Sequence, residues 1–242
     1  QSRSSAASDV YKRQSVCTPN AYHKEYTLAG FRVGCHVVCE KPVAVTCADA
    51  EEMFNAAEKA GKHLFVIQSL RFTGNFKAAA GLAKSGCLGD IYYADLNLVR
   101  RRGVPRWGMF HMAKENVGGA FCDLGVHMCD YLMSISGNPK MVSVSGSAVT
   151  RIVNKEKNIE FSNAESGAPT GLFTPRKFDM KEFDVEEFAN GYIRLENGMT
   201  VTFKISWALN LPNSNTVSIC GDKGGLTIGD DGLKLLTTQG NY

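Results

Sequence analysis

The sequence lacks several features that would each assign it to a well-defined class of protein. Across 242 residues no apolar run approaches the ~20 residues needed to cross a bilayer, which argues against a membrane protein. The formal net charge of +3 is too small to indicate nucleic-acid binding. None of the 8 cysteines forms a Cys-x-x-Cys pair, so a zinc ribbon or thioredoxin-like site has no support. No Gly-x-Gly-x-x-Gly turn follows a strand anywhere.

What is present is an ordinary globular composition, with 44% hydrophobic and 21% charged residues. The length allows one large domain or two of moderate size. Several cysteines fall inside the apolar patterns of expected strands and helices, which favours a reduced, cytoplasmic protein without disulfides. Residues 1–14 are polar, have no periodicity and lack the apolar core of a signal peptide. We therefore expect them to be disordered and foreign to the domain.

A short apolar strand followed by a charged pair and a proline is the most informative stretch. The strand is expected over 35–39, and Glu40-Lys41-Pro42 follows it. Pro42 cannot donate to a sheet and favours an extended Lys41, which places this lysine at the carboxyl end of a buried strand. Ligands bind at that edge in open α/β sheets. The competing interpretation is a solvated strand end, and the string alone does not decide between them.

The chain from residue 15 to 68 alternates apolar strands with helical patterns. The expected strands cover 15–17, 35–39 and 63–68, and the expected helices cover 21–32 and 47–60. Thr46 is a suitable N-cap for the second helix, with Asp49 three residues on as an imperfect capping box. This alternation predicts a parallel sheet with right-handed crossovers.

After Arg71-Phe72 the character changes and the remainder is rich in strands. Helices are expected over 74–85 and 121–136, loops over 100–117 and 154–182, and strands over 91–99, 141–151, 185–195, 199–207, 215–220 and 226–228. The Glu196-Asn197-Gly198 stretch is typical of a hairpin turn. In strand 91–99 the even-numbered residues form the apolar face, so Tyr93 and Asn97 are expected to face a cavity.

The helix expected over 121–136 carries a polar stripe. Asp123 and His127 are four residues apart and share a face, which Asp130 extends. Such a stripe normally faces water. Two features favour a site instead: Asp123 lies near the helix N-terminus, where a carboxylate is stabilised, and Gly118-Gly119 allows close backbone approach.

The order of these pieces resembles the Gfo/Idh/MocA family of NAD(P)-dependent oxidoreductases, from about Ser15 to the C-terminus. The matching elements are Thr18-Pro19-Asn20 with His23, Glu40-Lys41-Pro42, Arg71-Phe72, Gly86-x-Leu88-Gly89, and Gly118-Gly119-x-x-x-Asp123-x-Gly125-x-His127-x-x-Asp130. The resemblance implies an α/β fold: a partial Rossmann parallel sheet over 15–72, then a substrate-binding α+β domain over 73–242 with an open, mostly antiparallel sheet. The family's Gly-rich phosphate turn would lie upstream, so we expect an internal fragment that ends before the final strands.

The resemblance also implies hydride transfer between NAD or NADP and a carbinol of a sugar or cyclitol. Lys41, Asp123 and His127 would be catalytic. A histidine near its reference pKa of ~6.5 suits the base for the hydroxyl proton. Lys41 would stabilise the developing alkoxide, and Asp123 would orient His127 or bind a substrate hydroxyl. The choice between NAD and NADP stays open, because the residue that reads the ribose would lie upstream.

The resemblance implies further site residues, although the motifs that carry them are less specific. The cofactor-binding set implied is Thr18, Pro19, Asn20, His23, Glu40, Lys41, Pro42 and Arg71. The substrate-binding set implied is Tyr93, Asn97, Arg101, Trp107, Asp123 and His127. Thr-Pro-Asn is also a common turn and helix cap, Arg71 could instead pack at the domain junction, and a solvated surface is the favoured interpretation for the other arginines. No metal is expected.

Alternative functions remain at this point. One is an NAD-assisted glycoside hydrolase of the same family, which would share Lys41 and the cofactor. Another is a metal-dependent hydrolase using His111, Asp123, His127 and Asp130, although no metal signature supports it. A third is an inert fragment, because half a Rossmann domain leaves sheet edges unpaired. We expect no nucleic acid, no membrane and a homo-oligomer formed through the open sheet. Since sequence upstream is expected, export stays open.

Overall fold

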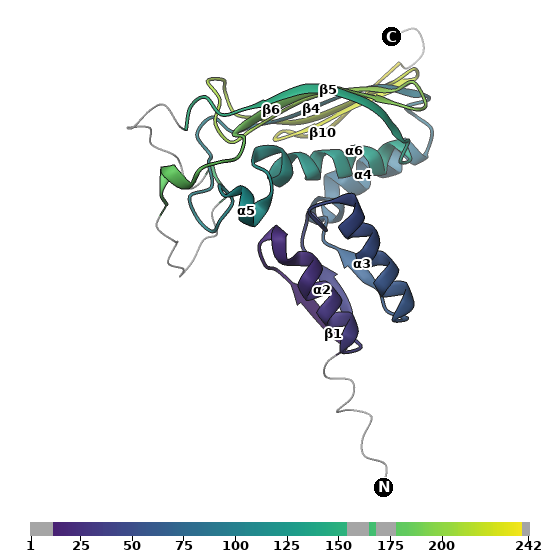
Figure 1. The fold of residues 1–242 in the computed structure, drawn as a ribbon. Coiled ribbons are helices and arrows are strands. Elements are labelled where there is room, and N and C mark those ends of the chain that lie inside the picture. Colours follow the sequence, from purple (N-terminus) through teal and green to yellow (C-terminus); the bar gives the residue numbers. More distant parts are fainter. Residues whose placement is uncertain (1–11, 154–164, 168–177, 239–242) are drawn as a thin grey trace. The chain divides into compact units, whose positions relative to one another are not determined.

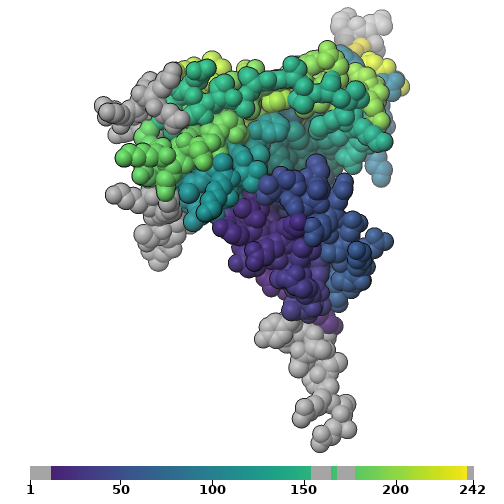
Figure 2. Space-filling view, in the orientation of Figure 1, coloured from purple at the N-terminus to yellow at the C-terminus, as the bar shows by residue number. Residues whose placement is uncertain are grey.

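The computed structural model describes residues 12–153, 165–167 and 178–238. They form two compact units, each described by itself below. The first takes in the described residues up to Gln68 together with Lys114–Val117, and the second takes in Ser69–Ala113 and the described residues from Gly118 onward. The division at Gln68 lies four residues before the boundary expected after residue 72. Figure 2 shows the purple and blue residues of the first unit as one continuous body.

The first unit is a three-stranded parallel sheet in the order β1-β2-β3, which confirms the predicted parallel topology. Its strands are β1 (Arg13–Val16), β2 (His36–Cys39) and β3 (Leu64–Val66), and its helices are η1 (Asn20–Tyr22), α2 (His23–Arg32) and α3 (Cys47–Lys59). Strand β1 begins at Arg13, two residues before the start expected from the sequence. Residues 1–11 of the segment expected to be foreign lie outside the described residues.

Successive side chains of each strand point to opposite faces of this sheet, and one of these faces is buried. Val16, Val37 and Cys39 pack with Met53 and Ala57 of α3 in a small apolar core. A side chain at Gly30 of α2 would place its Cβ 2.8 Å from a methyl group of Val37, so glycine allows this helix to approach the sheet.

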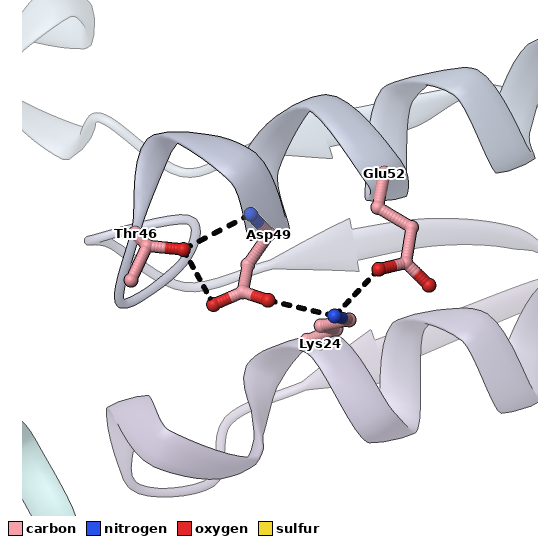
Figure 3. Close-up of polar contacts among 4 residues, drawn as sticks. All are labelled: Lys24, Thr46, Asp49 and Glu52. Atoms are coloured by element: carbon pink, nitrogen blue, oxygen red, sulfur yellow. Dashed lines mark hydrogen bonds and ion pairs between the residues drawn. The ribbon is translucent and has the colours of Figure 1, made fainter.

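The two helices of the first unit are also joined by a polar network (Figure 3). The Thr46 hydroxyl accepts a hydrogen bond from the Asp49 amide (3.1 Å), as the predicted N-cap requires. Lys24 of α2 forms ion pairs with Asp49 (2.7 Å) and Glu52 (2.5 Å) of α3. These groups hold α3 against α2 at its first turns.

The second unit is built on a seven-stranded sheet in the order β10-β9-β8-β4-β7-β6-β5. All neighbouring pairs are antiparallel except β4 with β7, so the fold class expected from the sequence is confirmed. The strands are β4 (Ile91–Val99), β5 (Met141–Val149), β6 (Phe188–Leu195), β7 (Thr200–Ser206), β8 (Ser214–Gly221), β9 (Gly224–Gly229) and β10 (Gly232–Thr237). The helical elements of this unit are η2 (Ser69–Phe72), α4 (Gly74–Lys84), the π-helical turn η3 (Phe121–Gly125), α6 (Val126–Ser136) and η4 (Met180–Glu182). Helix α5 (Ala113–Asn116) begins in this unit, but its remaining residues belong to the first unit.

Helices α4 and α6 cover one face of this sheet (Figure 1). Ala94 and Leu96 of β4 share the core with Leu124 of η3 and Met128 of α6. Tyr93, one residue out of phase, therefore lies on the opposite, open face. Among the described residues, no helix combines the length and apolar character that a bilayer crossing needs. Most of the loop expected over 154–182 lies outside the described residues.

Candidate active site

The carboxyl ends of the three parallel strands bring polar residues to one edge of the first unit. Thr18, Lys41 and Gln68 each follow one of the strands. The hydroxyl oxygen of Thr18 and the amide oxygen of Gln68 are buried and have no hydrogen-bond partner among the described residues. Buried polar atoms are normally satisfied, so two such atoms at the ligand-binding edge of a parallel sheet fit the polar groups of a nucleotide.

His23 connects two turns of this edge. Its Nδ1 lies 2.8 Å from the carbonyl oxygen of Pro42, and its Nε2 lies 3.0 Å from that of Thr18. The side chain is fully buried. The imidazole therefore fixes the Thr-Pro-Asn turn relative to the Glu-Lys-Pro turn. The peptide bond between Lys41 and Pro42 is cis, and the Glu40 carboxylate accepts a hydrogen bond from the Lys41 amide (3.3 Å).

The rest of the Thr-Pro-Asn turn holds a segment from later in the chain. The Pro19 carbonyl accepts from the Tyr22 amide (3.0 Å), and the Asn20 side chain donates to the carbonyl of Asn116 (3.1 Å). Glu115 is buried, and its carboxylate raises the pKa of Tyr22. These contacts explain why Lys114–Val117 belongs to the first unit, immediately before the glycine pair.

In the second unit, Glu186 caps the helix that carries Asp123 and His127. Its carboxylate accepts hydrogen bonds from the amides of Gly119 (2.8 Å) and Phe121 (2.9 Å). A Cβ at Gly119 would lie 1.9 Å from the Glu186 carbonyl oxygen, so only glycine fits there. The close backbone approach expected at the glycine pair is therefore an approach to Glu186.

Asp123 lies within the π-helical turn η3, and a buried tryptophan fixes it. The indole Nε1 of Trp207 donates to the Asp123 carboxylate over 3.0 Å, and Trp207 has no exposed surface. Trp207 directly follows β7, so the sheet itself sets the position of this carboxylate. His127 is the second residue of α6 and is half-buried.

A polar cluster adjoins Asp123. The Arg100 guanidinium donates to the Ser166 carbonyl (2.9 Å), and the Trp107 indole donates to the Ser166 hydroxyl (3.3 Å). Glu165 accepts from the amide of Arg102 (2.9 Å). Burial lowers the pKa of Arg100, and the carboxylates of Asp123 and Glu165 oppose that shift. We call Arg100, Trp107, Glu165 and Ser166 the Arg100 cluster.

The remaining residues expected to bind cofactor or substrate make other contacts, away from Asp123. Both ends of the Arg71 guanidinium bind the Asp130 carboxylate, at 2.6 and 2.7 Å. The Arg101 amide donates to the side-chain oxygen of Asn213 (2.7 Å), and the Arg101 side chain is exposed. The Tyr93 hydroxyl lies 2.8 Å from that of Thr202, on the open face of the sheet, and the Asn97 amide bonds to Asp95 on the same face. Tyr93 and Asn97 therefore lie on the face away from the helix of Asp123.

No group of three histidine, cysteine or acidic side chains gathers to hold a metal within the part of the chain that the structure describes. Of the four side chains that a metal-dependent hydrolase would use, Asp130 binds Arg71 and Asp123 binds Trp207. His111 is buried and faces Glu182 at 3.7 Å.

The fold, the polar edge of the parallel sheet and the surroundings of Asp123 define a class of protein. In this class a parallel sheet of the nucleotide-binding type is followed by an α+β domain with an open sheet. Two family models match the chain. "Oxidoreductase family, NAD-binding Rossmann fold" covers residues 6–68, and "GFO/IDH/MocA C-terminal domain" covers residues 76–227. The chain therefore belongs to the Gfo/Idh/MocA family.

Individual relatives agree with this assignment. The chain is 35% identical over 216 residues to D-glucoside 3-dehydrogenase of Escherichia coli (strain K12), covering 88% of this chain and 58% of the relative. It is 34% identical to scyllo-inositol 2-dehydrogenase (NADP(+)) IolW of Bacillus subtilis (strain 168), over 54% of this chain and 36% of the relative. An oxidoreductase domain protein from Kribbella flavida superimposes with a TM-score of 0.75 at 25% identity, covering 94% and 59% of the two chains. The chain thus spans little more than half the length of these longer matches.

Proposed function

We propose that this chain is part of an NAD(P)-dependent dehydrogenase that oxidises a carbinol of a sugar or cyclitol, with Lys41 and His127 as the acid/base pair. The names of the relatives support the substrate class, since one acts on D-glucosides and another on scyllo-inositol. The family model of the first unit supports a nicotinamide cofactor.

The observation that carries the proposal is the carboxyl edge of the parallel sheet. Lys41 stands there between the turns that carry Thr18 and Gln68, whose buried oxygens have no hydrogen-bond partner among the described residues. The Thr18 hydroxyl can both donate and accept, and the Gln68 amide oxygen can accept from a ribose hydroxyl or carboxamide. His23 holds the two turns in place rather than touching the cofactor. The residues present therefore fit a dinucleotide.

The second unit supplies groups suited to the substrate. The Asp123 carboxylate is oriented by Trp207 and can accept from a sugar hydroxyl. His127, one helical turn further on, can take the hydroxyl proton. The capped helix start holds both residues on one rigid element.

When bound, an oxidised nicotinamide supplies the acceptor for the hydride that leaves the carbinol carbon. His127 would remove the hydroxyl proton as the carbon–oxygen double bond forms. The Lys41 ammonium would stabilise the negative charge that develops on that oxygen. Asp123 would hold the sugar so that the reacting hydroxyl lies toward the imidazole.

The test measures reduced nicotinamide formed by the purified 242-residue chain from NAD⁺ or NADP⁺ with methyl β-D-glucopyranoside or scyllo-inositol. Lys41→Met and His127→Gln should each lower kcat by about 10²–10⁴-fold, because each removes a group acting in proton transfer or charge stabilisation. Lys59→Met, at the end of α3, is the matched control and should retain full activity.

Equal rates in Lys41→Met and Lys59→Met would contradict the proposed role of Lys41. Absence of reduced nicotinamide with every polyol would contradict a dehydrogenase activity of this chain. Release of free sugar from a glycoside without net reduction of the cofactor would instead indicate the glycoside hydrolase.

We also infer a homo-oligomer formed through the open face of the seven-stranded sheet. That face carries half-buried polar side chains, among them Tyr93 and Thr202, which already hydrogen-bond to one another. Lys204 pairs with Asn97 and Asn190 in register on the same face. Lys204→Glu should lower the mass measured by light scattering, and a wild-type chain that runs as a monomer would contradict the inference.

A further inference from the structure

Of the Arg100 cluster, only Trp107 was expected from the sequence to bind substrate, and the cluster lies beside the carboxylate proposed to hold the substrate. Arg100 follows β4 directly, and its amide donates to the Ser206 carbonyl (3.0 Å), which extends the pairing of β4 with β7 by one residue. The sheet thus anchors the backbone of Arg100, whereas the guanidinium itself bonds to Ser166. The Arg100 side chain is half-buried, whereas the side chain of the next residue, Arg101, is exposed.

Close packing fixes the surroundings of this guanidinium. A Cβ at Gly103 would lie 2.5 Å from the Glu165 carbonyl oxygen and 2.7 Å from Cδ of Arg100. Ser166 is buried and accepts from Arg100 at its carbonyl and from Trp107 at its hydroxyl. Residues 100–107 therefore pack against residues 165–166 from a distant part of the sequence, which leaves the Arg100 side chain little freedom.

The chemistry of the cluster combines three functions that an uncharged sugar ring needs. The guanidinium has five N–H donors in a planar fork, more than the one bond to Ser166 uses. Asp123 offers carboxylate oxygens as acceptors. The indole N–H of Trp107 is directed to Ser166, and its ring packs edge-to-face on Phe110 at 4.7 Å between centroids, so the indole provides a rigid apolar surface.

We propose that Arg100 is a specificity-determining residue: with Asp123 it forms a donor–acceptor pair for neighbouring hydroxyls, and Trp107 is the apolar wall, so that the second unit selects an uncharged pyranoside. This inference rests on the proposed function and names its substrate class. A sugar acid is disfavoured, because its carboxylate would approach both Asp123 and Glu165.

The chain itself provides the probe. Its 2 tryptophans are Trp107 and Trp207, and one contacts Ser166 of the cluster while the other contacts Asp123. Intrinsic fluorescence of the full chain, titrated with methyl β-D-glucopyranoside and with D-glucuronate, therefore reports on this site without any cofactor. The wild-type chain should bind the uncharged glycoside at least about threefold more tightly than the anion.

Arg100→Met should weaken glycoside binding by about tenfold or more, as expected for the loss of a charged donor. Arg100→Lys keeps the charge but not the planar fork of donors, so its affinity for the glycoside should lie between those of the wild type and Arg100→Met. This variant also tests the proposal if Arg100→Met does not fold. Arg32→Met, an exposed arginine at the end of α2, is the matched control and should bind as the wild type does.

Equal affinities in the Arg100→Lys and Arg32→Met variants would overturn the proposal. Tighter binding of D-glucuronate than of the glycoside would also overturn it, by making Arg100 a carboxylate receptor, and so would fluorescence that responds to neither sugar. Because this titration contains no nicotinamide, failure of the dehydrogenase assay would leave its result standing, and the two proposals can fail separately.

Discussion

Replacing Gly119 with alanine should strongly destabilise the second unit, although it adds only one methyl group. The new Cβ would meet the Glu186 carbonyl oxygen at 1.9 Å and the Glu186 amide nitrogen at 3.0 Å. Both atoms are backbone, so they can yield only if the start of the helix moves. Such overpacking costs about 1–3 kcal/mol. Displacement also weakens the bonds from Gly119 and Phe121 to the Glu186 carboxylate, and a lost helix cap costs about 1 kcal/mol.

The expected loss is therefore about 2–4 kcal/mol in the free energy of unfolding. Both tryptophans lie in the second unit, so urea denaturation followed by tryptophan fluorescence monitors that unit directly. With a urea dependence of about 1–3 kcal/mol per molar, the midpoint should fall by about 1 M or more.

Gly81→Ala is the matched control for this substitution. Gly81 lies inside α4, and a Cβ there would meet nothing within 4 Å. Because alanine favours helix, the control should stabilise the chain by up to about 1 kcal/mol. A Gly119→Ala midpoint equal to that of the wild type would refute the assignment of Glu186 as the cap that requires glycine.

Three other predictions concern stability. A double-mutant cycle on Arg71 and Asp130 should give a coupling of about 1 kcal/mol at most, because the guanidinium is 44% exposed and solvent screens the pair; a coupling of about 3 kcal/mol or more would contradict this screening. His23→Ala should lower the thermal midpoint, since it removes the buried imidazole that lies between the carbonyls of two turns, and an unchanged midpoint would contradict the role of His23 in connecting them. Burial raises the pKa of Cys39 and of Cys129 from 9.0 to about 11, so the folded chain holds these protons where the unfolded chain has lost them. The contribution of these two thiols to stability should be constant just below pH 9 and fall between about 9 and 11, and a urea midpoint that rises across that interval would have the wrong sign.

Local patterns were sufficient to predict most of the elements. The alternation of short apolar strands with helical spacing predicted the parallel sheet, and the Thr46 cap is found where the sequence placed it. Elements too short for a pattern were missed. Helix α5 has only four residues, and β10 is an edge strand whose Leu235 and Leu236 are exposed, so neither shows a buried periodicity.

The site was predicted only in part, because its geometry depends on distant partners. Asp123 and His127 could be placed together by helical spacing, but Trp207, 84 residues from Asp123, and Glu186, 67 residues from Gly119, have no local signal. Arg100 stands in a run of three arginines, which the sequence does not distinguish. Burial and partners separate Arg100 from Arg101: the Arg100 side chain is half-buried and donates to Ser166, whereas the Arg101 side chain is exposed.

The proposed chemistry is tested most directly by the fate of the hydrogen on the reacting carbon. The chain would be incubated with an oxidised nicotinamide and a glycoside carrying deuterium at its carbinol carbons, and the reduced cofactor would be analysed by mass spectrometry. We predict deuterium in the nicotinamide ring with the wild-type chain and its loss in both Lys41→Met and His127→Gln. Reduced cofactor free of deuterium, or transfer in these variants equal to that of the wild type, would contradict hydride transfer by these residues.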